Sequence, residues 1–277
     1  MILKSKRKIF NVLNNIKCLR DPHLLGVVLG LDYKVLYGIN ISKHDLEILR
    51  LLLSECYLLL NKELLIKVLN KKPMILKFGN NLFRVECAED LYHSSMCYEA
   101  ETLSFIEHNV KCGGIFVDVG ANIGGFTVRL SAKSKVYAFE PDPRNYYILC
   151  SNLRLNNLKA ITCNNATYDT ENKVKLYISE YHGRHSVAKP RSRYIWVKAV
   201  KLDDVLISED SLDVLKIDVE GAELNVLRGA ASTLLKTRFV VIECTILGMN
   251  KLVKEFLADY GFKYTKRLEN NCLYSRI

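Results

Sequence analysis

Residues 116 to 127, FVDVGANIGGFT, constrain the fold of this 277-residue chain more than any other segment. A hydrophobic strand runs into Asp118 and then into a turn that holds Gly120, Gly124 and Gly125. Glycines permit a tight turn and let the backbone come close to a bulky polar ligand. In an open parallel sheet such a turn lies at the carboxyl end of a strand, where ligands bind. The segment therefore predicts an α/β fold with a ligand site at this turn.

Strand-like and helix-like segments alternate from about residue 99 onward. The predicted strands are 114–120, 135–140, 160–166, 174–179, 195–202, 212–221 and 239–245, and the predicted helices are 101–110, 126–132, 143–157, 222–235 and 249–260. Such alternation is typical of a parallel sheet covered by helices. Two strand-like runs around a Glu-Asn-Asn turn in 262–277 predict a terminal antiparallel hairpin. We expect a Rossmann-like, doubly wound sheet.

The N-terminal part carries most of the net charge. Residues 1–77 hold 14 Lys and Arg against 6 Asp and Glu, which is a surplus of +8 out of the net +10 of the chain. Ser42 and Asp45 resemble a helix-capping box, and charges interrupt the apolar run over 45–70 too often for a membrane span. We therefore expect a basic helical extension at 1–75 and a main domain at 76–277, which opens with a short hairpin at 74–86. For the extension, a solvated surface and contact with an anionic membrane or nucleic acid both stay open.

The nine cysteines are odd in number and scattered, and no C-x-x-C pair occurs. This pattern supports neither a zinc ribbon nor a disulfide framework. The expectation is a cytoplasmic protein with reduced, mostly buried thiols, which could bind peripherally to a membrane through its basic extension.

The ligand of the glycine turn is narrowed by the polar residues around it. A dinucleotide turn needs glycine where this chain has Asn122, and a phosphate-binding loop of the Walker type needs a lysine that the turn lacks. Asp118 would repel a pyrophosphate but suits a ligand with a positive amino group. Glu140 ends the next strand and can hold both hydroxyls of a ribose, while Asn165 can recognise an adenine edge. Ribose, adenine and a cationic amino acid tail together indicate S-adenosylmethionine.

The chain resembles the FkbM family of class I S-adenosylmethionine-dependent methyltransferases. The resemblance rests on 116–127, on VYAFEPDPRNYYILCSNLRLNN and above all on VKLDDVLISEDSLDVLKIDVEGAELNVLRGA. It implies a seven-stranded sheet with a reversed terminal hairpin and O-methylation of sugars, glycans or glycosylated metabolites and lipids. Carried over to this chain, the implied cofactor-binding residues are Asp118, Gly120, Ala121, Asn122 and Gly124 for the methionine part, Glu140 and Pro141 for the ribose, Asn165 and Ala166 for the adenine, and Asp218 at the reacting end.

A sugar hydroxyl needs a base to take its proton, and four residues are candidates. Alternation along the strand 212–221 puts Lys216, Asp218 and Glu220 on one side. Asp218 and Glu220 should therefore approach the site together, unless Asp218 caps the next helix and Glu220 pairs with Lys216. Glu243, at the end of the following strand, and His185 are the other candidates. The H-x-x-H pair of His185 lacks a helix or a third ligand, and no metal site is predicted.

Residues 181–202 contain six Lys and Arg and no acidic residue. This loop suits an acceptor that bears phosphate, such as a nucleotide sugar or a lipid-linked glycan, although a solvated basic loop fits equally. Tyr181, Tyr194 and Trp196 could stack on sugar rings or belong to the sheet core. The alternatives to a small-molecule or glycan O-methyltransferase are an RNA methyltransferase and a non-catalytic partner protein that binds the cofactor. The absence of a recognisable RNA-binding module argues against nucleic acid as a partner.

Overall fold

The computed structural model describes residues 73–276 except 97, 181 and 245–248. The predicted extension at 1–75, with its capping box, lies almost wholly outside the described residues, so the domain boundary near 75 stays a prediction. The described chain begins with strands β1 (Met74–Phe78) and β2 (Asn81–Val85), which form a two-stranded sheet as the hairpin pattern predicts. Helix α6 (Ala88–Ser94) follows and was not predicted. Residues 80–82 and 99–276 belong to one compact unit, which contains all the candidate site residues.

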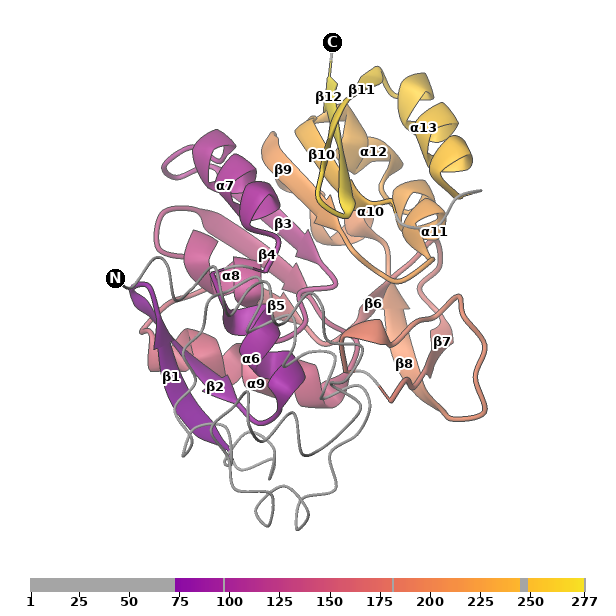
Figure 1. Cartoon of the computed structure of the whole chain (residues 1–277). Coiled ribbons are helices and arrows are strands. Elements are labelled where there is room, and N and C mark those ends of the chain that lie inside the picture. The colour runs from indigo at the N-terminus through magenta and orange to yellow at the C-terminus, as the bar shows by residue number, and fades with distance from the viewer. Residues whose placement is uncertain (1–72, 97, 181, 245–248, 277) are drawn as a thin grey trace, which may run out of the picture. The chain divides into compact units, whose positions relative to one another are not determined.

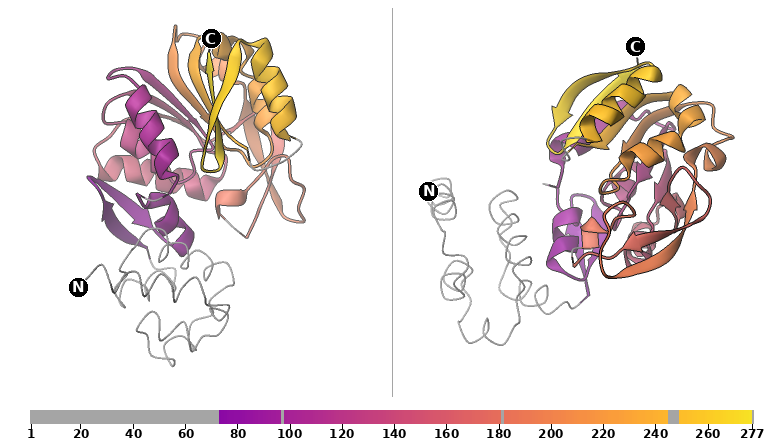
Figure 2. Two further views of the ribbon diagram at one scale, coloured as in Figure 1. Left: turned by 45° about the horizontal axis from the view of Figure 1, so that its top comes forward. Right: turned by 90° about the vertical axis from the view of Figure 1, so that its right-hand side faces the viewer.

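The centre of this unit is a seven-stranded sheet (Figure 1) with the order β11-β12-β10-β9-β3-β4-β5. Its strands are β3 (Ile115–Val119), β4 (Lys135–Phe139), β5 (Ile161–Cys163), β9 (Leu212–Ile217), β10 (Thr237–Glu243), β11 (Phe262–Leu268) and β12 (Asn271–Arg276). Strand β12 pairs antiparallel with β10 and β11, and the inner strands pair in parallel. The Rossmann-like sheet and the terminal hairpin (Figure 2, yellow) are therefore confirmed.

Helices pack on both faces of the sheet because its inner strands are apolar on both sides. Helices α7 (Ala100–Asn109) and α8 (Gly125–Leu130) contact β9, β3 and β4, and α9 (Pro143–Leu155) packs on α8. Residues of the remaining helices form one core cluster with the sheet; these helices are α10 (Leu202–Val205), α11 (Glu223–Arg228), α12 (Ala231–Leu235) and α13 (Met249–Asp259).

Two predicted elements are divided in the structure. The helix predicted at 222–235 breaks into α11 and α12 at Gly229, where a Cβ atom would lie 2.2 Å from the carbonyl oxygen of Tyr168. The strand predicted at 160–166 splits into β5 and β6 (Ala166–Thr167). Strand β6 belongs to a separate three-stranded sheet with β8 (Tyr194–Val200) and β7 (Lys173–Tyr177), in the order β6-β8-β7.

The expectation of reduced thiols is wrong for one pair. Cys244 follows β10, Cys272 lies on the antiparallel neighbour β12, and the two form a disulfide with their Cα atoms 5.7 Å apart. Sequence spacing could not reveal the pair, because 28 positions separate cysteines that only the sheet brings together. In the part of the chain that the structure describes, no helix is long and apolar enough to cross a bilayer.

Candidate active site

The glycine turn after β3 passes directly over the end of β9. A Cβ atom on Gly120 would lie 1.8 Å from the carbonyl oxygen of Asp218, and Gly120 has a φ of 81°. The backbone N–H groups of Gly120 and Ala121 both donate to the carbonyl oxygen of Phe139 on β4, at 3.0 Å. No side chain fits at position 120, because the turn must touch both neighbouring strands. The turn therefore brings three strand ends together at one place.

Asp118 lies in β3 with its carboxylate buried below this turn. Its Oδ2 atom accepts a 2.6 Å hydrogen bond from the Thr127 hydroxyl, while Oδ1 has no hydrogen-bond partner among the described residues. Burial raises the pKa of Asp118, and the ammonium of Lys216, its partner on β9, counteracts this. A buried acceptor atom without a donor suits a ligand that brings an N–H group, as the methionine part of S-adenosylmethionine does.

Glu140 follows β4, and both of its carboxylate oxygens are held in place. Oε2 accepts from the backbone N–H of Asn122, and Oε1 from that of Asp142, each at 2.8 Å. Burial raises the pKa of Glu140 to about 8. Each oxygen keeps a second lone pair, so the carboxylate can accept from two adjacent ribose hydroxyls. This geometry fits the predicted ribose-binding role.

The predicted adenine-binding residues lie just past β5. The side-chain amide of Asn165 donates to the carbonyl oxygen of Lys198 at 3.5 Å, and Ala166 is buried in β6. The neighbouring Asn164, which the sequence reasoning missed, donates to the carbonyl oxygens of Glu140 (2.8 Å) and Pro141 (3.2 Å). Asn164 therefore ties the end of β5 to the predicted ribose-binding position. The sequence signal is a pair of adjacent asparagines, and the pattern alone does not show which of the two binds the backbone after β4.

A fully buried lysine lies beside Asp218, the residue predicted at the reacting end of the cofactor. The Lys216 ammonium lies 3.1 Å from Oδ2 of Asp218, and the residue is 2% exposed. Burial lowers its pKa, but the carboxylates of Asp218, Glu99 and Asp118 outweigh this effect and raise the pKa above the usual value. Lys216 is therefore a fixed cation among three carboxylates.

Glu99 is the member of this group that the sequence reasoning missed. It stands before α7 with a left-handed φ of 46° and is 8% exposed. Burial raises its pKa to about 7, against the lowering effect of Lys216. Its Oε2 atom finds no hydrogen-bond donor in the described structure. A single glutamate ahead of an amphipathic helix gives no pattern from which such a role could be read.

Three acidic residues meet where β9 and β10 end, and we call them the carboxylate cluster: Asp218, Glu220 and Glu243. One oxygen from each lies within 4.8 Å of the others. The Lys189 ammonium lies 2.7 Å from Glu220, and Lys216 holds Asp218. The spacing would admit a divalent cation, but two of the three carboxylates already have a cationic partner. Three of the four predicted base candidates thus lie together.

The alternative roles weighed for these acids differ from what the structure shows. Asp218 does not cap the following helix, since α11 has Ala222 at its N-cap without a side-chain cap. Glu220 pairs with Lys189 and not with Lys216. Glu220 also has a left-handed φ of 57°, as is common at functional sites that store backbone strain.

His185, the fourth candidate, holds the loop between β7 and β8. Its Nδ1 atom accepts from the backbone N–H of Ser179 at 3.0 Å, and Nε2 lies 3.6 Å from the Asp142 carboxylate. From the same loop, the Ser186 hydroxyl donates to the carbonyl oxygen of Glu220 at 2.8 Å. These contacts support an anchoring role for His185, and its role as a base stays a prediction.

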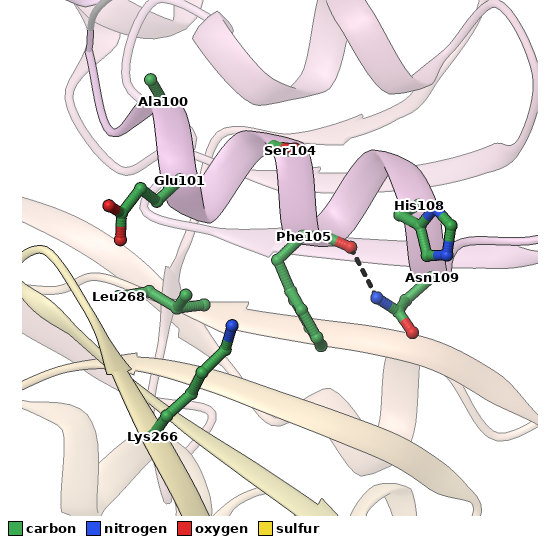
Figure 3. A pocket seen from close by; sticks show the side chains of 8 residues that line it. All are labelled: Ala100, Glu101, Ser104, Phe105, His108, Asn109, Lys266 and Leu268. Atoms are coloured by element: carbon green, nitrogen blue, oxygen red, sulfur yellow. Dashed lines mark hydrogen bonds between the residues drawn. The ribbon is translucent and has the colours of Figure 1, made fainter.

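An open pocket of about 650 Å³ lies between α7 and β11 (Figure 3). Its lining includes Glu101 and His108 from α7 and Lys266 from β11, and it contains none of the predicted site residues. The site described above is therefore not this pocket but the cluster of strand ends around Gly120.

A family model decides which family the chain belongs to. Residues 118–264, more than half of the chain, match the methyltransferase FkbM domain. The chain belongs to the FkbM methyltransferase family. S-adenosylmethionine is accordingly the cofactor of this FkbM methyltransferase, in agreement with the buried Asp118 and Glu140.

Two curated relatives are matched over about three quarters of their own length. Methyltransferase sdnD of Sordaria araneosa is 32% identical over 199 residues, 57% of this chain and 77% of the relative. Hexuronic acid methyltransferase AglP of Haloferax volcanii is 26% identical over 180 residues, 62% of this chain and 74% of the relative. Among solved structures, M. jannaschii TYW2 in complex with AdoMet has 18% identity and a TM-score of 0.43, covering 74% of this chain and 87% of that one.

Proposed function

We propose that this FkbM methyltransferase transfers a methyl group to a hydroxyl of a sugar, glycan or glycosylated metabolite or lipid. The carboxylate cluster carries this proposal, because it lies at the turn that binds the cofactor: Gly120 packs against the backbone of Asp218. A hydroxyl acceptor needs a proton acceptor at that place. Hexuronic acid methyltransferase AglP supports a sugar acceptor, and 2-O-methyltransferase NoeI of Sinorhizobium fredii, which is 28% identical over 174 residues, supports transfer to oxygen.

Within the cluster, Glu220 is the residue that we assign as the base. Asp218 is fixed by the fully buried Lys216 and serves to orient the acceptor. Glu220 pairs with Lys189, whose side chain is 39% exposed, and such a partly exposed ion pair exchanges readily when an acceptor enters. Bound S-adenosylmethionine would supply the electrophilic methyl group on its sulfonium. The residues around it hold the hydroxyl in line, and such alignment supplies much of the rate.

The acceptor class follows from the loop that contacts Glu220. Lys189 belongs to a loop that also carries Arg184, Arg191 and Arg193, and this loop has no acidic residue after Glu180. These cations suit an acceptor with phosphate or carboxylate groups, such as a nucleotide sugar or a lipid-linked glycan. A place in the cytoplasm, peripheral to a membrane, would suit a lipid-linked acceptor.

The test uses the purified full chain with methyl-labelled S-adenosylmethionine and a panel of sugars, nucleotide sugars and RNA. We expect label in a sugar, and a loss of turnover of roughly 100-fold or more in Glu220→Gln. The matched control is Glu255→Gln, an exposed acid on α13 that should leave turnover unchanged. Label in RNA alone would establish the RNA alternative. Cofactor binding without any labelled product would establish the non-catalytic one.

A further inference from the structure

The outer face of the β7–β8 pair gathers aromatic and basic side chains. We call it the aromatic–lysine face, and its members are Lys173, Lys175, Tyr177, Tyr194, Trp196 and Lys198. The antiparallel register places Lys175 opposite Trp196 and Tyr177 opposite Tyr194. Alternate residues point to the other side of the sheet, where Leu176 and Val197 are buried. The aromatic rings are thus not part of the core.

The rings of this face are open to solvent. Trp196 is 57% exposed and Tyr194 is 44% exposed, and their rings stand edge to face with centroids 6.0 Å apart. The Lys175 ammonium lies 4.3 Å from the Tyr194 centroid and 5.5 Å from that of Trp196. Neither strand contains an acidic residue. Exposed rings under a cation, on strands without acidic residues, suit a partner that carries anionic groups.

The loop between β7 and β8 connects this face to the candidate active site. The loop between β7 and β8 carries Ser186 and Lys189, which bind the backbone and the carboxylate of Glu220. Strands β6, β7 and β8 lie apart from the seven-stranded sheet (Figure 1). A long acceptor that enters beside Lys189 would therefore meet the same hairpin farther along.

We propose that the aromatic–lysine face binds an acidic oligosaccharide stretch of the acceptor, beyond the sugar that is methylated. This inference rests on the proposed function. Sugar rings present apolar C–H faces that pack against Trp196 and Tyr194, while the three lysines pair with carboxylate, sulfate or phosphate groups. A membrane-binding surface would add exposed aliphatic side chains, and this face has none. RNA bases could stack on the same rings, so oligouridylate RNA is the competing ligand in the test below.

Trp196 is the one tryptophan of the chain, so intrinsic fluorescence reports on this face directly. The full-length protein is titrated with tetragalacturonate, a sulfated heparin tetrasaccharide and neutral maltotetraose. We expect an acidic tetrasaccharide to shift the emission, to protect Trp196 from iodide quenching and to bind more weakly as salt rises. Lys175→Gln and Tyr194→Ala should each weaken this binding by roughly tenfold.

Two matched controls separate a specific surface from general charge. Tyr264→Ala removes a ring on β11 that is also 44% exposed, and Lys251→Gln removes an exposed lysine on α13. Both should bind the acidic tetrasaccharide as the wild type does. The proposal is overturned if neither acidic tetrasaccharide binds, if maltotetraose binds equally, or if oligouridylate RNA or vesicles with phosphatidylserine bind more tightly.

A turnover assay distinguishes this proposal from the proposed function. If sugars are methylated while Lys175→Gln and Tyr194→Ala leave the KM for a long acidic acceptor unchanged, the aromatic–lysine face does not bind the acceptor. Sugar O-methylation would still be supported. If acidic tetrasaccharides bind at Trp196 but no sugar is ever methylated, the function fails and the binding surface stands.

Discussion

Replacing Glu140 by glutamine tests the electrostatics of the candidate cofactor site. The carboxylate is 6% exposed, and burial raises its pKa from 4.5 to about 8. As the pH rises through this interval the unfolded chain releases the proton while the folded chain keeps it, so the free energy of unfolding falls. Between about pH 5.5 and about pH 8.5 these two pKa values correspond to a loss of roughly 3 kcal/mol. Glutamine does not ionise, so Glu140→Gln removes this loss.

The measurement is urea denaturation of the cofactor-free protein at both pH values, followed by circular dichroism. Glutamine offers one acceptor to the two backbone N–H groups of Asn122 and Asp142, which costs about 1–3 kcal/mol at either pH and cancels in the comparison. We expect the unfolding free energy of the variant, relative to wild type, to rise by roughly 3 kcal/mol from the lower to the higher pH. A difference that does not change with pH refutes the reasoning. The exposed Glu255→Gln is the control.

The same variant also tests the ribose-binding role. At about pH 8.5, where the Glu140 carboxylate is mainly ionised, the loss of one charged acceptor should weaken the binding of S-adenosylhomocysteine by roughly 10- to 100-fold, measured by titration calorimetry. Wild-type affinity in this variant would show that Glu140 does not bind the ribose. The expected pH dependence of stability would not be affected.

Four further outcomes are expected. Lys216→Met should lower the free energy of unfolding by about 3–5 kcal/mol, because it leaves the Asp218 carboxylate without its buried cation, and an unchanged urea midpoint would contradict this. Cys272→Ser should lower the free energy of unfolding by roughly 3–4 kcal/mol in oxidising buffer, since it opens a loop of 28 residues. In reducing buffer, the variant and the wild type should be equally stable. Gly120→Ala should abolish S-adenosylhomocysteine binding, and retained binding would mean that the turn can move off Asp218. EDTA should leave methyl transfer unchanged, since lysines already pair with two members of the carboxylate cluster; activity that is lost and then restored by Mg²⁺ would place a metal there.

The sheet and the core of the site could be predicted because they depend on local patterns. Alternating segments specify which residues form strands, and in a parallel sheet all strand ends with polar residues meet at one edge. Asp118, Glu140 and Asp218 each end or follow a strand, and the structure brings all three to that edge. Asp118 and Glu140 are buried there, and this burial raises the pKa of each.

The missed features depend on contacts between segments far apart in the sequence. The backbone conformation of Glu99 and its approach to Lys216 follow from the packing of α7, which no local pattern encodes. The exposure of Trp196 depends on which face of the three-stranded sheet is buried. The alternation of side chains along β8 is compatible with burial of either face. The helix divides at Gly229, where the backbone lies close to Tyr168 of a segment far away in the sequence.

The left-handed residues at the site have a consequence for engineering. Of the five non-glycine residues with positive φ in the described chain, Glu99, Asn122 and Glu220 lie at the candidate site. For the two glutamates this conformation costs roughly 1–2 kcal/mol each, a cost that glycine would not carry. A selection for heat tolerance alone would therefore favour glycine at 99 and 220 and remove two carboxylates with it. A selection that is to keep these two glutamates therefore has to measure turnover as well as melting temperature.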